Sequence, residues 1–176
     1  MPRSSKALIF WPLVTALVAV DRVTKVIAEQ SLWPRGVPQP VAGDWLRLTL
    51  VYNPGAAFGF HLGPYSRWIF LGLTLGALVI LMRLYLHTAP SDRWRALAVA
   101  LVTSGAIGNL IDRIVSPRGV VDFIDVGFGD MRWPTFNVAD MAVSTGALLL
   151  AYVLWGEDRA AERAAAVTAE SRQQVS

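Results

Sequence analysis

Four apolar stretches, each long enough to cross a lipid bilayer as a helix, dominate the chain. They cover residues 7–28, 68–87, 94–114 and 137–155. A helix needs about 20 mostly apolar residues to span a hydrocarbon core of about 30 Å. The first stretch follows a short basic segment, as in a signal peptide, but it continues without a small-residue cleavage site. The pattern therefore predicts an all-α membrane protein with four transmembrane helices, the first of them retained.

Two long polar segments, residues 29–67 and 115–136, connect these helices. In the first segment, the residues from Trp45 to Tyr52 alternate, with three leucines on one face, as they do in a strand. Loops of this length are often functional. We expect a small β-rich cradle in the first segment and a second loop in the other.

The basic residues favour an orientation with both termini in the cytoplasm. Half of the 16 Lys and Arg residues then lie inside, on the short segments and span ends that weigh most in the positive-inside rule. Both long segments would face the outside. Residues 1–156 are thus predicted to form one four-helix transmembrane domain with extracytoplasmic loops, followed by a charged cytoplasmic tail at 157–176.

The composition narrows the possible chemistry. Of the 176 residues, 54% are hydrophobic and only 16% are charged, whereas soluble proteins carry about 25% charged residues. The absence of cysteine excludes disulfides, cysteine nucleophiles and Cys-ligated zinc, and two histidines leave little material for a His-based metal site. No basic run with interleaved aromatic residues indicates nucleic-acid binding. We therefore expect no metal, no cofactor and no nucleic-acid partner.

Polar residues inside or beside the spans gather toward one end of their helices. They are Asp21, Lys25, Asn109, Asp112, Arg113, Asn137 and Asp140. Such residues are rare in spans and usually face a polar interior. In a small transporter or proton-translocating subunit, the main alternative function, they would line a path through both halves of the bilayer. Here the opposite halves of the spans are almost purely apolar. A noncatalytic assembly factor that uses the acids for docking is a second alternative.

Two acids in apolar surroundings, Asp122 and Asp140, are candidates for catalysis. Asp122 lies between Val-Val and Phe-Ile pairs, and Asp140 opens the fourth span. Apolar surroundings raise the pKa of a carboxyl group, and two neighbouring carboxyl groups tend to share one proton. One can then act as a base toward water while the other donates to a carbonyl oxygen, which is aspartyl peptidase chemistry. Asp125 and Asp130, in a Gly-rich segment, are expected to be solvated.

Several of these residues also have a purely structural interpretation. Asn137 and Asp140 fit a helix N-cap followed by an acidic third residue. Asp21 and Lys25 fit an ion pair between positions i and i+4 of a helix. Arg113 fits a long side chain that reaches the membrane interface.

Five sequence blocks lie at the span ends and in the two long segments. They are Asp21-x-x-Thr24-Lys25, Asn53-x-Gly55-Ala56-Ala57-Phe58-Gly59, Gly105-x-x-Gly108-Asn109-x-x-Asp112-Arg113, Val120-Val121-Asp122-Phe123 and Phe136-Asn137-x-Ala139-Asp140. In this order and placement, over roughly residues 7–156, the chain resembles the bacterial lipoprotein signal peptidases, or signal peptidase II. Ser104 stands where that family usually has glycine, so one small residue replaces another.

The resemblance implies an aspartyl endopeptidase of the bacterial cytoplasmic (inner) membrane, with its site near the outer face. It implies cleavage of prolipoproteins before a diacylglyceryl-modified cysteine, contact with membrane lipid, and inhibition by the cyclic peptide globomycin. Asp122 and Asp140 would form the catalytic dyad. The resemblance assigns substrate binding or support of the site to Asn53, Asn109, Arg113, Asn137, Asp21 and Lys25.

Overall fold

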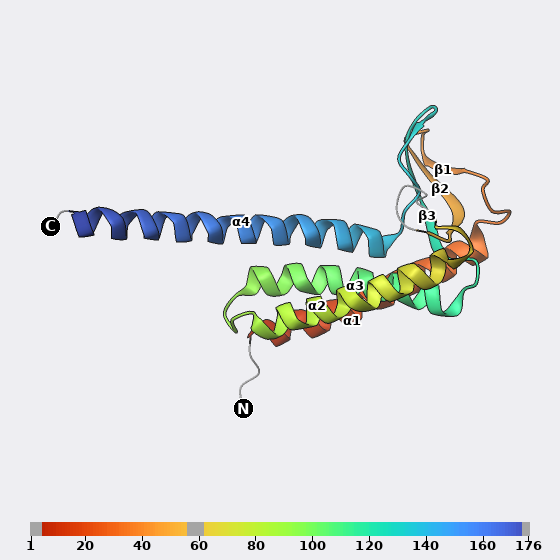
Figure 1. The fold of residues 1–176 in the computed structure, drawn as a ribbon. Coiled ribbons are helices and arrows are strands. Elements are labelled where there is room, and N and C mark those ends of the chain that lie inside the picture. The colour runs from red at the N-terminus through yellow and green to blue at the C-terminus, as the bar shows by residue number, and fades with distance from the viewer. Residues whose placement is uncertain (1–4, 56–61, 174–176) are drawn as a thin grey trace.

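The described part of the protein contains four long helices, a short 3-10 helix (Gly63–Tyr65) and one small antiparallel sheet (Figure 1). The structure, a computed structural model, describes residues 5–55 and 62–173. The helices are α1 (Ser5–Ser31), α2 (Ser66–His87), α3 (Arg93–Val115) and α4 (Val138–Gln173). Each has the length and apolar composition needed to cross a membrane. This confirms the predicted class, a mostly helical membrane protein with four spans.

Helix α4 is much longer than the apolar stretch that begins it. It continues without a break to Gln173, and its C-terminal part extends past the ends of the other three helices (Figure 1). The alanine, glutamate and arginine residues that fill this extension have high helix propensity, so the helix has no local reason to end at the edge of the span.

Helix α3 is the central helix of the bundle. It packs against α1, α2 and α4, and 56% of its span is buried, compared with 17% or less in the other three. Glycine permits this close packing: a Cβ atom placed on Gly105 would lie 2.2 Å from the carbonyl oxygen of Ala139. Small residues at a helix contact let two backbones approach closely. The third sequence block therefore brings α3 against the first turn of α4, next to Asp140.

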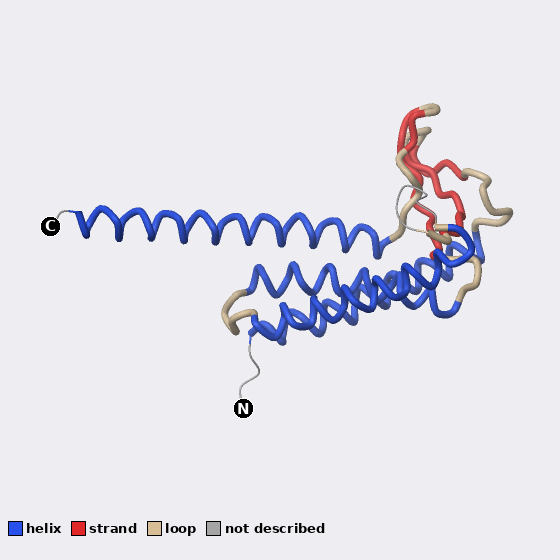
Figure 2. Tube along the Cα trace, in the orientation of Figure 1, coloured by secondary structure: helices blue, strands red, loops and turns tan. Residues whose placement is uncertain are grey.

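A four-stranded antiparallel sheet lies at one end of the bundle (Figure 2). Its strands, in spatial order, are β1 (Gln39–Ala42), β2 (Leu46–Asn53), β3 (Val120–Phe128) and β4 (Met131–Arg132). Strand β2 confirms the strand predicted at residues 45–52. Strand β3 comes from the second polar segment, which the sequence pattern predicts to be a loop. Its partner β2 lies far earlier in the chain, so no local signal announces the pairing.

An apolar cluster attaches the sheet to the bundle. Leu50 of β2 and Val121 and Phe123 of β3 pack with Ala28 and Leu32 at the end of α1. Successive side chains of a strand point to opposite faces. The residue between Val121 and Phe123 therefore points away from this cluster, and that residue is the first of the two candidate acids.

The prediction that Asp125 is solvated is wrong, whereas Asp130 is exposed as expected. Asp125 is only 5% exposed and accepts hydrogen bonds from Arg132 Nε at 2.8 Å, Thr49 Oγ1 at 3.0 Å and Arg47 Nε at 3.1 Å. Burial by itself would raise the pKa of Asp125, but the hydrogen bonds from Arg132, Thr49 and Arg47 outweigh it and hold that pKa below its ordinary value. Asp125 thus ties β2, β3 and β4 together.

Candidate active site

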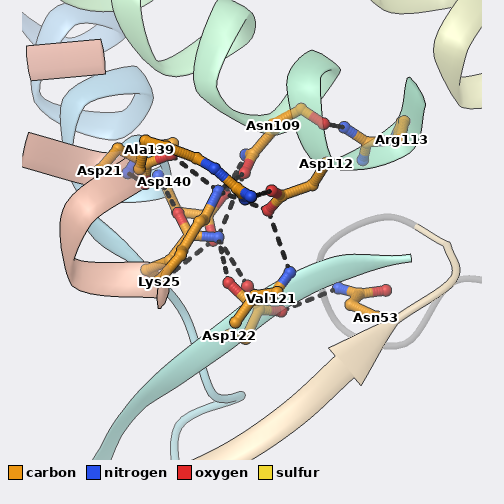
Figure 3. Close-up of polar contacts among 12 residues, drawn as sticks. Asp21, Lys25, Asn53, Asn109, Asp112, Arg113, Val121, Asp122, Ala139 and Asp140 are labelled. Atoms are coloured by element: carbon orange, nitrogen blue, oxygen red, sulfur yellow. Dashed lines mark hydrogen bonds and ion pairs between the residues drawn. The ribbon is translucent and has the colours of Figure 1, made fainter. Parts of the chain in front are cut away.

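The polar ends of three helices meet strands β2 and β3 where the bundle joins the sheet (Figure 3). One network of hydrogen bonds and ion pairs connects every side chain that the sequence singles out as a site residue. These are Asp21, Lys25, Asn53, Asn109, Arg113, Asn137, Asp122 and Asp140. The residues come from α1, β2, α3, β3, α4 and the turn before α4, so the site exists only in the folded bundle.

Asn137 joins the two candidate acids. Its side-chain nitrogen Nδ2 donates to Asp122 Oδ1 at 2.7 Å. Its side-chain oxygen accepts from the backbone N–H of Asp140 at 2.9 Å, and its own backbone N–H donates to Asp140 Oδ2 at 3.3 Å. The structural interpretation of Asn137 and Asp140 as a capping pair is therefore confirmed. It coexists with a second role, because the capping residue also holds the acid on β3.

Two further asparagines complete the contacts of the acids. Asn53 Nδ2 on β2 donates to Asp122 Oδ2 at 3.3 Å, and Asn109 Nδ2 on α3 donates to Asp140 Oδ1 at 2.8 Å. Each acid therefore receives an N–H donor at both of its oxygens. Neutral amide donors orient a carboxylate without adding a full charge, so these contacts set the orientation of both acids.

The surroundings of Asp122 make its ionisation difficult. Asp122 is 2% exposed. Burial, together with repulsion from Asp140, raises its pKa to about 7, against an ordinary value of 3.8, and the donors Asn53 and Asn137 offset only part of the rise. An acid with a pKa near neutrality, beside a second acid, is suited to hold one proton jointly with it and to exchange that proton with substrate and water.

Asp122→Asn is expected to stabilise the protein more at pH 8 than at pH 5. The raised pKa of Asp122 means that its contribution to stability is fully present below pH 3.8 and is lost as the pH rises through about 7. Asparagine does not ionise and avoids this loss, so the gain should be on the order of 3 kcal/mol larger at pH 8. Thermal unfolding in detergent micelles at both pH values measures it. Asp130→Asn, at an exposed acid, should show no such difference, and equal shifts for Asp122→Asn at both pH values would contradict the prediction.

Arg113 connects helix α3 to the turn that follows β2. Its guanidinium donates to the backbone oxygen of Gly55 and to that of Asn109, both at 3.2 Å. Within the same turn, the backbone N–H of Gly55 donates to the side-chain oxygen of Asn53 at 3.0 Å. Arg113 thereby holds the turn that carries Asn53. The rest of this sequence block, residues 56–59, lies outside the described residues.

The predicted ion pair between Asp21 and Lys25 is confirmed, and it has a third member. Lys25 Nζ lies 2.8 Å from Asp21 Oδ2 and 2.8 Å from Asp112 Oδ2. Asp112 is 1% exposed. Sequence reasoning did not include Asp112 among the site residues, although its spacing was informative: it lies three positions after Asn109, on the same face of α3.

A buried acid, Asp122, held next to a half-buried one, Asp140, at the end of a bundle of apolar helices is the arrangement expected of a membrane enzyme of the aspartyl peptidase class. The sequence model of the family described as signal peptidase (SPase) II matches residues 13–155, and the chain belongs to this family. Because this family consists of peptidases, the transporter alternative finds no support.

Known relatives and solved structures agree with this assignment. The lipoprotein signal peptidase of Hydrogenovibrio crunogenus is 44% identical over 153 residues, which cover 84% of this chain and 85% of the relative. That of Cupriavidus necator is 40% identical over 151 residues, covering 84% and 83%. A bacterial membrane enzyme solved by the in meso method superposes with a TM-score of 0.73 at 31% identity, over 83% of this chain and 87% of that one.

Proposed function

We propose that this protein is an aspartyl endopeptidase that removes the signal peptides of prolipoproteins by cleaving before a diacylglyceryl-modified cysteine. The observation that carries the catalytic assignment is the bridge through the buried Asn137, which contacts both the buried Asp122 and the half-buried Asp140. The relatives named lipoprotein signal peptidase support the class of substrate.

In the proposed reaction, the two acids work with one shared proton. The ionised carboxylate takes a proton from a water molecule, whose oxygen attacks the scissile carbonyl carbon, while the protonated acid donates its proton to the carbonyl oxygen. The tetrahedral intermediate then collapses: the C–N bond breaks, the proton taken from water passes to the leaving amine, and one hydroxyl of the intermediate returns its proton to the carboxylate that had donated it, which restores the shared proton. The asparagines at positions 53, 109 and 137 keep both acids oriented throughout, so little reorganisation accompanies the reaction.

We place the site near the outer face of the cytoplasmic membrane, with both termini in the cytoplasm. The support is the distribution of basic residues, half of which would lie on short cytoplasmic segments and span ends. In this orientation the lipid on the substrate and the C-terminal end of its signal helix reach the acids from the surrounding bilayer. Globomycin is proposed to inhibit by occupying the space in front of the same two acids.

Cleavage of a precursor should depend on its lipid. Purified full-length protein in lipid vesicles is expected to cleave a diacylglyceryl-modified precursor at least about 100-fold more efficiently, in kcat/KM, than the same precursor without lipid. Acyl chains supply binding energy remote from the scissile bond, and they hold that bond at the depth of the acids. A gel-shift assay measures cleavage, with the Asp122→Asn variant as control for contaminating proteases. Equal cleavage of both precursors would reject the substrate assignment.

A further inference from the structure

Two buried carboxylates outside the proposed catalytic pair each hold the backbone next to one member of that pair. Asp21 Oδ1 on α1 accepts the backbone N–H of Ala139 at 2.8 Å, one residue before Asp140. Asp112 Oδ2 on α3 accepts the backbone N–H of Val121 at 3.1 Å, one residue before Asp122. The two contacts are equivalent: in each, a buried acid holds the backbone N–H of the residue that precedes a candidate catalytic residue (Figure 3).

One ammonium group joins these two carboxylates. Lys25 is 0% exposed, and its Nζ lies 2.8 Å from both Asp21 Oδ2 and Asp112 Oδ2. The same nitrogen donates to Asn109 Oδ1 at 3.0 Å, and Asn109 in turn contacts Asp140. A continuous polar path therefore runs from the backbone of β3 through Asp112, Lys25 and Asp21 to the backbone of α4.

The packing of α3 makes room for this arrangement. A Cβ atom placed on Gly108 would lie 2.5 Å from Asp21 Oδ2, so the glycine leaves the space that the carboxylate occupies beside Lys25. The other oxygen of Asp112, Oδ1, lies 3.3 Å from Arg22 Nη1. The Arg22 side chain is 42% exposed, so it covers the cluster where the cluster approaches the protein surface. The formal charges of the two acids, Lys25 and Arg22 cancel, so the group adds no net charge beside the proposed catalytic acids.

Stability alone is a weak explanation for such a group. Removing charges from water has a large desolvation penalty, and replacing a complete buried ion pair with neutral residues of similar size is often neutral or stabilising. What a charged cluster supplies instead is a defined geometry, since every carboxylate oxygen of Asp21 and Asp112 lies within 3.3 Å of a named N–H or ammonium group. Strand β3 and helix α4 belong to different parts of the fold, and a proton can be shared only if their acids stay within hydrogen-bond reach.

We propose that Asp21, Lys25 and Asp112 form a positioning unit that sets the spacing of Asp122 and Asp140: the two carboxylates hold the backbone N–H groups of the residues just before the acids, and one ammonium group joins the two carboxylates. The inference rests on the proposed peptidase function and deepens it. The three residues touch neither water nor substrate in the reaction; they act through the backbone of the residues that precede the two acids.

The decisive experiment removes the charges but keeps the hydrogen-bond acceptors. In the triple variant Asp21→Asn, Lys25→Met and Asp112→Asn, both asparagine oxygens can still accept the N–H groups of Ala139 and Val121. The full-length variant is expected to fold with a Tm equal to or above that of the wild type. Its kcat should fall about 100-fold, because a misplacement of about 1 Å has an effect of that size, while KM stays within about threefold.

A pair of single variants tests the backbone contact itself. Asp112→Leu removes the acceptor for Val121 and should lose about 100-fold in kcat, whereas Asp112→Asn retains the acceptor and should recover to within about tenfold of the wild type. If Asp112→Leu does not fold, the triple variant decides. The matched control is Asp92→Asn with Arg95→Met at the opposite end of α3. Asp92 there also accepts a backbone N–H, that of Arg95 at 3.0 Å, and pairs with a cation; this variant should keep the wild-type kcat.

The outcomes separate the positioning unit from the peptidase function. If the wild type cleaves the lipidated precursor, Asp122→Asn does not, and the triple variant keeps the wild-type kcat, the positioning unit is rejected and the peptidase function stands. A triple variant that loses kcat and Tm together would also reject the unit, because the residues would then act only on stability. If the wild type does not cleave the precursor, both proposals fail.

Discussion

Replacing Asp122 or Asp140 with asparagine should abolish peptidase turnover while leaving the fold and substrate binding intact. General acid–base catalysis by one positioned group raises the rate about 10²- to 10⁴-fold. Here each acid both gives up a proton and takes one back during a single turnover. We therefore expect kcat to fall at least about a thousandfold in either variant. Asparagine preserves the shape of the side chain and an oxygen for the donors Asn137 or Asn109, so the surrounding network can persist.

Single-turnover cleavage of a lipidated precursor measures this loss, and thermal unfolding checks the fold. Asp130→Asn is the matched control, because Asp130 lies in the turn after β3 but is exposed; it should retain the wild-type rate. Substrate binding, measured with a fluorescent lipidated peptide, should change by less than about threefold, since the lost interaction acts in the transition state. Retained cleavage by either Asp122→Asn or Asp140→Asn would reject the catalytic pair.

Gly105→Ala is expected to destabilise the protein strongly and to reduce cleavage with it. The new Cβ would lie 2.2 Å from the carbonyl oxygen of Ala139 and 2.6 Å from Val143 Cγ2, distances at which the backbone of α4 has to move. Overpacking of this kind has an effect of about 1 to 3 kcal/mol or more. Because Ala139 precedes Asp140, displacement of the first turn of α4 also moves one of the two acids.

The matched control for this substitution is Gly76→Ala on α2. A Cβ atom at Gly76 would have no neighbour within 4 Å, so the same chemical change there should be neutral or stabilise the helix by up to about 1 kcal/mol. Thermal unfolding and the cleavage rate, measured for both variants in the same vesicles, compare a crowded position with an open one. Equal behaviour of the two variants would mean that close approach of α3 and α4 is not required.

Local sequence patterns were enough to predict the membrane-spanning architecture. A span must satisfy its backbone hydrogen bonds within the segment itself, because lipid offers none, so a long apolar run predicts a helix without reference to the rest of the chain. The capping pair Asn137 and Asp140 and the ion pair Asp21 and Lys25 were predictable for the same reason, since each joins residues within one turn of a helix.

Contacts between distant parts of the chain were not predictable in this way. The sequence pattern predicts a loop for residues 115–136, but β3 forms there because it pairs with β2, and Asp122 stands opposite Val51 in that register. Asp125 was expected in water and is buried, because Arg47 and Arg132 approach it from neighbouring strands. Both results follow from pairing across the sheet, which leaves little trace in a local window.

The four spans, the two acids in apolar surroundings and the polar residues that could surround them can all be read from local patterns, because hydrophobicity and helix spacing are properties of neighbouring residues. Three-dimensional packing was needed to learn that Asn137 reaches both acids, that Lys25 joins Asp21 to Asp112, and that these carboxylates hold the backbone of β3 and α4. Such contacts depend on distances of a few ångströms between elements far apart in the chain, and those distances arise when the glycine-lined face of α3 packs against its neighbours.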